Sequence, residues 1–140
     1  MPFARILVAI DGSQGAVRAL TTTLELAQLT GAAVTALTIE GPLPAYAATI
    51  GEVDEVKRQK DRFFATVADD AREQAAQAGV PIEVEVRAGH AASLITGYAR
   101  DHGADLVVVG HRGHFLEDYV LGSTADRVAH HAHCPVMIVK

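Results

Sequence analysis

Strand-like apolar runs alternate with segments of helical periodicity along the sequence, and this alternation restricts the folds open to the chain. The strand-like runs are residues 3–10, 33–39, 81–87, 106–109 and 136–139. The helical segments are the stretch between Ser13 and Gly31 and then residues 52–78, 91–102 and 123–131. Strands that alternate with helices predict a parallel sheet covered on both faces. We therefore expect an α/β fold: a doubly wound, Rossmann-like sheet of five parallel strands in the order 3-2-1-4-5, with helices on both faces.

Turn-forming and capping residues mark the boundaries of these elements. Ser13 is placed to cap the first helix. Residues 40–51, which are rich in glycine and proline, predict a loop. Residues 81–87 alternate apolar and charged side chains, a pattern typical of an edge strand with one solvated side. The glycines expected to end helices in the left-handed conformation are Gly31, Gly79 and Gly103.

Length and composition narrow the class of protein. The chain has 140 residues, the usual size of one domain, so we expect a single domain over residues 1–140. A net charge of −5 provides no basic surface for nucleic acid. We expect neither a signal peptide nor a membrane span, since no apolar run approaches the roughly 20 residues that a bilayer requires. The single cysteine, Cys134, excludes an internal disulfide and favours a reducing compartment, so we expect a cytoplasmic protein.

A glycine-flanked segment follows the fourth strand and precedes the fourth helix. The apolar run ending at Val109 leads into Gly110-His111-Arg112-Gly113, and Gly122-Ser123-Thr124 opens the helix. Glycine lets backbone N–H groups approach an anion closely, so this order of elements indicates a phosphate site, although a tight loop alone would use the same residues. Ser123 is expected to be the N-cap, with Asp126 completing a pair like a capping box.

The first strand ends in a second polar segment, Ala9-Ile10-Asp11-Gly12-Ser13. In a doubly wound sheet, ligands bind beyond the carboxyl ends of the strands, where the strand order reverses. If the first strand is central, the reversal lies between the first and fourth strands. The two polar strand ends are therefore expected to meet at one crevice, where Asp11 either contacts a ligand or caps the first helix.

The chain resembles the universal stress protein family over essentially its full length. The resemblance is carried by residues 6–13, by Gly110-His111-Arg112-Gly113, by Leu121-Gly122-Ser123 and by residues 134–139. The ATP-binding branch of that family has Gly, two residues, Gly, nine residues, and then Gly with Ser or Thr. In this chain the second gap, residues 114–121, holds eight residues.

The resemblance implies a role for each matched residue. Gly110, Gly113, Gly122 and Ser123 would hold the phosphates and ribose of an adenine nucleotide, and Thr124 would add a backbone N–H. Asp11 would contact the nucleoside, and Ala9, Ile10 and Ile39 would line the adenine pocket. Val109 lies at the same strand end, and the Arg112 side chain either neutralises phosphate charge or faces solvent. The ligand implied is ATP, or another adenine nucleotide, with Mg²⁺ or Mn²⁺.

The function implied is that of a nucleotide-dependent signalling or interaction module in the stress response, acting on a protein partner that the sequence does not identify. The shortened gap leaves open an interaction protein whose site is vestigial. No lysine follows Gly113 in the Walker spacing and there is no nucleophile elbow, so we assign no catalytic residue and expect at most a slow ATPase.

Two features near the C-terminus bear on assembly and metal binding. Residues 136–139 are wholly apolar, and an edge strand of this kind is expected to pair with its copy in a homodimer, as the resemblance also implies. His130, His131, His133 and Cys134 cluster in sequence, but their spacing does not match a structural zinc site. A solvated helix end is the other interpretation, and no metal ligands are assigned.

Overall fold

The computed structural model describes residues 3–40, 50–111 and 122–140, apart from the side chains of residues 50, 52 and 53. Nine elements follow one another in these ranges. They are β1 (Arg5–Ile10), α1 (Gln14–Thr30), β2 (Ala33–Glu40), α2 (Ile50–Ala78), β3 (Ile82–Ala88), α3 (Ala91–Asp101), β4 (Leu106–Gly110), α4 (Ser123–His131) and β5 (Val136–Val139). The alternation expected from the sequence is therefore present.

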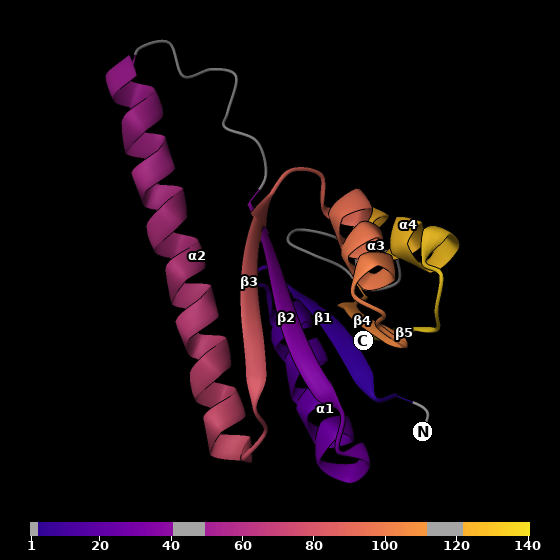
Figure 1. Ribbon diagram of the computed structural model, residues 1–140. Helices are drawn as coiled ribbons and strands as arrows, with labels where there is room; N and C mark the ends of the chain where they lie inside the picture. The colour runs from indigo at the N-terminus through magenta and orange to yellow at the C-terminus, as the bar shows by residue number, and fades with distance from the viewer. Residues whose placement is uncertain (1–2, 41–49, 112–121) are drawn as a thin grey trace.

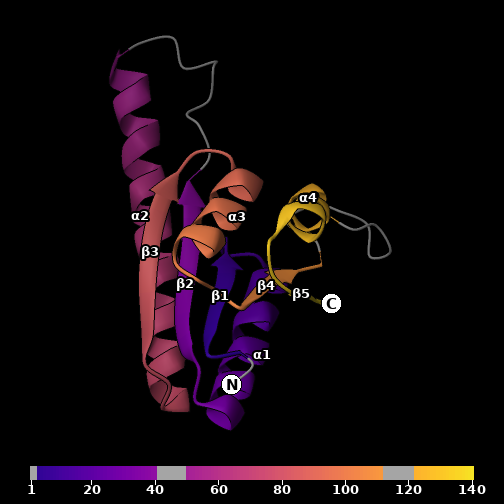
Figure 2. The same cartoon turned by 45° about the vertical axis from the view of Figure 1, so that its right-hand side comes forward.

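The five strands form one parallel sheet in the order β3-β2-β1-β4-β5, which confirms the predicted topology. Helices α1 and α2 cover one face, and α3 and α4 cover the other (Figure 1). β3 is an edge strand, as its alternating pattern predicted, and β5 forms the opposite edge (Figure 2). The strand order reverses between β1 and β4, where a ligand crevice was expected.

Each face of the sheet has its own apolar core. On the side of α1 and α2, Val8 and Val108 of the central strands pack with small side chains of the helices, such as Ala19 and Ala75. On the side of α3 and α4, the core includes Leu7, Leu37, Val107, Ile95 and Val128. Small side chains at the helix–sheet contacts let the helices approach the sheet closely, and the central strands β1 and β4 are buried on both faces, as is usual in a parallel sheet.

Most element boundaries agree with the sequence patterns to within one or two residues. Gly31, Gly79 and Gly103 have positive φ angles of 74°, 71° and 66°, as expected for residues that end helices. The boundary of α2 differs, because this helix begins at Ile50 and includes Gly51, which the sequence placed in the loop over 40–51. One glycine costs a helix only about 1 kcal/mol, and the 29-residue helix tolerates it. Glu40, also placed in that loop, is the last residue of β2, and the remainder, residues 41–49, lies outside the described residues. Among the helices that the structure describes, none combines the length and apolarity needed to cross a bilayer.

Candidate functional site

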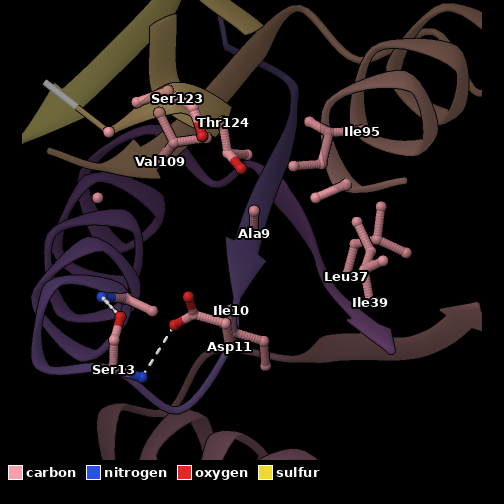
Figure 3. Close-up of a pocket in the computed structure, with 15 residues that line it drawn as sticks. Ala9, Ile10, Asp11, Ser13, Leu37, Ile39, Ile95, Val109, Ser123 and Thr124 are labelled. Carbon is pink, nitrogen blue, oxygen red and sulfur yellow. Dashed lines mark hydrogen bonds between the residues drawn. The ribbon is translucent and has the colours of Figure 1, made fainter. Parts of the chain in front are cut away.

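A cavity of about 360 Å³ opens at the carboxyl ends of β1, β2 and β4, at the reversal of strand order (Figure 3). Its volume lies within the range of roughly 300–1,000 Å³ that is usual for small-molecule sites. Nine of the eleven residues proposed from the sequence line it: Ala9, Ile10, Asp11, Ile39, Val109, Gly110, Gly122, Ser123 and Thr124. The other two, Arg112 and Gly113, lie outside the described residues.

The sequence patterns missed six further lining residues: Ser13, Ala16, Leu37, Ala91, Ile95 and Ala125. Two of them, Leu37 and Ile95, belong to the apolar wall of the cavity. Leu37 lies two residues before Ile39, so both side chains project from the same face of β2. Ile95 follows Ala91 by four residues and therefore shares its helix face. Leu37 could have been found by extending the predicted pocket from Ile39 along the strand period. Ile95 could not, because no residue of α3 belonged to the predicted pocket.

The chain turns sharply from β1 into α1 at one side of the cavity. Gly12 has φ 83° at this turn, a conformation that side chains other than glycine rarely adopt. The Ser13 N–H donates to Asp11 Oδ1 (2.9 Å), and the Ala16 N–H donates to Ser13 Oγ (3.1 Å), as the dashed lines in Figure 3 show. Ser13 is thus the N-cap of α1, as predicted. Asp11 orders the turn from two residues before the N-cap and does not itself cap the helix, while its carboxylate remains at the cavity.

The N-terminus of α4 is capped differently from the expectation. The N-cap is Gly122, with no side-chain hydrogen bond, and Ser123 is the first helical residue. The first backbone bond of the helix runs from the Asp126 N–H to the Gly122 carbonyl (2.9 Å). The Asp126 carboxylate instead lies 3.5 Å from His130 Nδ1. The predicted N-cap at Ser123 and its pairing with Asp126 are therefore wrong. Gly122 has the extended backbone of an N-cap, and Ser123 is already helical.

This difference leaves the amino terminus of α4 open at the cavity. Helix geometry gives the N–H groups of the first turn, those of Ser123, Thr124 and Ala125, no partner within the helix. All three residues line the cavity, and Figure 3 shows the hydroxyl groups of Ser123 and Thr124 at its wall across from Asp11. Unpaired N–H groups and the positive end of the helix dipole favour an anion at this place.

Gly110 has a structural reason to be glycine besides its place in the cavity wall. A Cβ atom on Gly110 would lie 2.9 Å from the carbonyl carbon of Gly15 and 3.0 Å from its oxygen. These are backbone atoms in the first turn of α1, so they cannot move aside as the end of a side chain could. Gly110 was interpreted as a residue that lets a ligand approach. That interpretation is incomplete, because the missing Cβ atom also lets the first turn of α1 pack against Gly110.

The residues on either side of the undescribed segment 112–121 are bonded to each other. The Gly122 N–H donates to the His111 carbonyl (2.9 Å), and the His111 N–H donates to Val139 of β5 (2.7 Å). The end of β4 and the start of α4 are thus held together beside the cavity.

The cavity offers a metal ion few protein ligands. Asp11 is the only carboxylate among its described lining residues. The described residues contain no group of three or more His, Cys, Asp or Glu side chains placed to hold a metal ion. Cys134 packs half-buried against the core on the α4 side of the sheet, and this burial, together with Asp105, raises the pKa of its thiol.

Comparison with known proteins gives this site a context. The sequence model of the universal stress protein family matches residues 2–140. The chain belongs to the universal stress protein family. One relative, the universal stress protein YxiE of Bacillus subtilis, is 30% identical over 147 residues, and the match covers 99% of each chain.

Solved universal stress proteins have the same fold. UspA from Lactobacillus plantarum superimposes with a TM-score of 0.86 at 29% identity, covering 100% of this chain and 99% of its own. A universal stress protein crystallised in complex with cAMP gives a TM-score of 0.78 at 25% identity, again covering 100% of this chain and 99% of that one. A member of this family has therefore been solved with an adenine nucleotide.

Proposed function

We propose that this universal stress protein binds an adenine nucleotide in the cavity at the carboxyl ends of β1, β2 and β4. The observation that carries the proposal is the open amino terminus of α4. It lies at the wall of a cavity that also has an apolar wall. The contrast with α1 is informative, because the Ser13 hydroxyl caps α1 whereas no side chain of the described residues caps α4. A helix start without a cap at the wall of a cavity suits a phosphate.

The remaining walls fit the other parts of a nucleotide. Leu37, Ile39 and Ile95 provide an apolar surface for a base. Asp11, fixed by its bond from the Ser13 N–H, can accept hydrogen bonds from ribose hydroxyl groups through its second carboxylate oxygen. The relative solved with cAMP supports the same class of ligand.

Within this class we propose ATP with Mg²⁺ or Mn²⁺ as the ligand. A cation in this cavity would rest mainly on the phosphate oxygens, as Mg²⁺ commonly does, with Asp11 as the available carboxylate. The described lining contains no paired nucleophile and base, which favours a nucleotide-controlled interaction module in the stress response over an enzyme. The unpaired thiol of Cys134 agrees with a reducing compartment, and we place the protein in the cytoplasm.

We further propose that the protein is a homodimer joined through β5. This strand pairs with β4 along one side only. The bonds from Val107 to Pro135 and from His111 to Val139 leave the backbone groups of Val136 and Ile138 pointing away from β4. A second copy of β5 would satisfy them under two-fold symmetry.

Calorimetric titration with ATP, AMP and adenosine tests the nucleotide proposal. We expect all three to bind, with AMP at least tenfold tighter than adenosine because its phosphate reaches the open terminus of α4. Denaturing freshly purified protein and identifying released nucleotides by chromatography and mass then shows which nucleotide it carries. Absence of binding at millimolar ATP and AMP would reject the proposal and favour an interaction protein with a vestigial site.

A further inference from the structure

We infer that the groove between α3 and α4 is a second anion site that takes a phosphate group. The groove has a volume of about 270 Å³ and adjoins the nucleotide cavity, because Ala91, Ser123 and Thr124 line both. The two helices lie next to each other on one face of the sheet (Figures 1 and 2). The nucleotide proposal is needed only for one of the two possible sources of this phosphate.

Three basic side chains line the groove. Arg127 and His131 are four residues apart and share one face of α4, and His90 approaches from the start of α3. Arg127 forms no ion pair within the part of the chain that the structure describes. No carboxylate occurs among the described residues of the lining, although the chain as a whole carries a net charge of −5. A groove that holds a guanidinium and no carboxylate among its described residues favours anions on an otherwise acidic protein.

Hydrogen-bond donors accompany these charges. The hydroxyl groups of Ser93, Ser123 and Thr124 line the groove, and across residues 3–40, 50–111 and 122–140 none of them has a hydrogen-bond partner. Thr96 is different, since its hydroxyl donates to the Ala92 carbonyl (3.0 Å) and is not free to donate to a ligand. Three hydroxyl donors and a guanidinium match the several acceptor oxygens of a phosphate.

The backbone of α3 adds to this preference. Its N-cap, His90, makes no side-chain capping bond, so the imidazole of His90 is not engaged by the helix. The first backbone bond of α3 runs from the Leu94 N–H to the His90 carbonyl, which leaves the N–H groups of Ala91, Ala92 and Ser93 without helical partners. The amino termini of α3 and α4 thus both lie at the groove, where the guanidinium of Arg127 supplies a full positive charge.

A metal ion is the alternative ligand for two histidines, and the composition of the groove disfavours it. His90 and His131 have no carboxylate or thiolate beside them in the described lining. The guanidinium of Arg127 would repel a cation bound between them. The groove therefore fits a phosphate better than a metal.

Two sources could supply the phosphate. One is the phosphoryl chain of a nucleotide that extends from the adjoining cavity past Ser123 and Thr124. The other is free inorganic phosphate, which would occupy the groove independently of the nucleotide. Both present the same chemistry to Arg127.

Calorimetric titration with inorganic phosphate at matched ionic strength, chloride replacing phosphate in the control, tests the site. We expect Arg127→Gln to weaken phosphate binding at least tenfold. Arg18→Gln removes the same charge from an exposed position on α1, outside the cavity and the groove, and should leave phosphate binding unchanged. In proton NMR spectra, phosphate should shift the ring resonances of His90 and His131 but not those of His102.

Titrations with ATP and adenosine distinguish the sources. If the nucleotide supplies the phosphate, Arg127→Gln weakens ATP but not adenosine, and saturating phosphate competes with ATP. If free phosphate is the ligand, neither Arg127→Gln nor saturating phosphate changes the affinity for ATP. If adenosine and ATP do not bind but phosphate binding still depends on Arg127, the nucleotide proposal is rejected and the anion site is retained. Equal phosphate binding by wild type and Arg127→Gln, or no phosphate binding, would overturn the groove as an anion site.

Discussion

Gly110 shows how one residue can satisfy two requirements at the same place. It lies in the wall of the cavity proposed to bind a nucleotide, and its missing Cβ atom also makes room for the first turn of α1. A change of binding in a Gly110 variant would therefore not distinguish a lost ligand contact from a displaced helix. Ser123 and Thr124 are better positions for testing the ligand, because their side chains are not enclosed by the core.

Gly110→Ala should destabilise the protein by about 1–3 kcal/mol, since the new methyl group overpacks against the backbone of Gly15. Gly97→Ala is the matched control. A Cβ atom on Gly97 meets only the end of the Arg100 side chain, at 3.8 Å, and alanine favours the helix by roughly 0.5–1 kcal/mol. Chemical denaturation of both variants measures the two free energies of unfolding. Equal stability of Gly110→Ala and wild type would refute the close packing.

The helix starts are the elements on which the candidate site depends. The sequence patterns predicted the existence of every helix, because Leu20 and Leu24 in α1, like other buried residues, recur with the helical period. They identified the N-cap of α1 but not that of α4. Gly122 and Ser123 are adjacent and both suit an N-cap, so the choice depends on how the chain enters the helix after β4. That path is set by tertiary bonds such as that from Gly122 to His111, which local preference does not encode.

A pair of alanine variants tests this difference between the two helices. Ser13→Ala should cost about 1 kcal/mol of stability, because the Ala16 N–H loses its capping oxygen. Ser123→Ala should cost nearly nothing, since the Ser123 hydroxyl caps no backbone group. Urea denaturation provides both values. Comparable losses in the two variants would mean that Ser123 caps α4 after all.

At the scale of the whole molecule, the order of the sheet determines both the cavity and the free edge. Placing β1 between β2 and β4 brings Asp11 and Gly110 to one crevice, and it leaves β5 unpaired on one side. The alternation of elements predicted the parallel sheet, and the position of the crevice followed once the first strand was taken to be central. Leu37 was overlooked although it shares a strand face with Ile39, which was predicted. Ile95 was not predicted, because no sequence pattern indicated that α3 borders the cavity.

The free edge gives a prediction for assembly. Ile138→Pro should convert the dimer to a monomer, because it removes an N–H that points away from β4 and is available to a second copy of β5. Ile138→Ala shortens the same side chain, retains the N–H and should leave the dimer largely intact. Sedimentation velocity measures both, with circular dichroism as a check on folding. A monomeric wild type would contradict the proposal.

The proposed nucleotide binding depends on a phosphate at the amino terminus of α4. Proline at the first position of a helix is well tolerated, and both Gly122 and Ser13 have the extended backbone that a following proline requires. Ser123→Pro therefore removes one N–H, together with the Ser123 hydroxyl, from the cavity with little cost to the fold. Gln14→Pro makes the same change at the start of α1, where Gln14 does not line the cavity.

The most direct test is calorimetric titration of these two variants and wild type with AMP and adenosine. We predict that Ser123→Pro weakens AMP at least tenfold and leaves adenosine unchanged, whereas Gln14→Pro affects neither. AMP binding that is equally tight in Ser123→Pro and wild type would contradict the account, because the phosphate would then lie elsewhere.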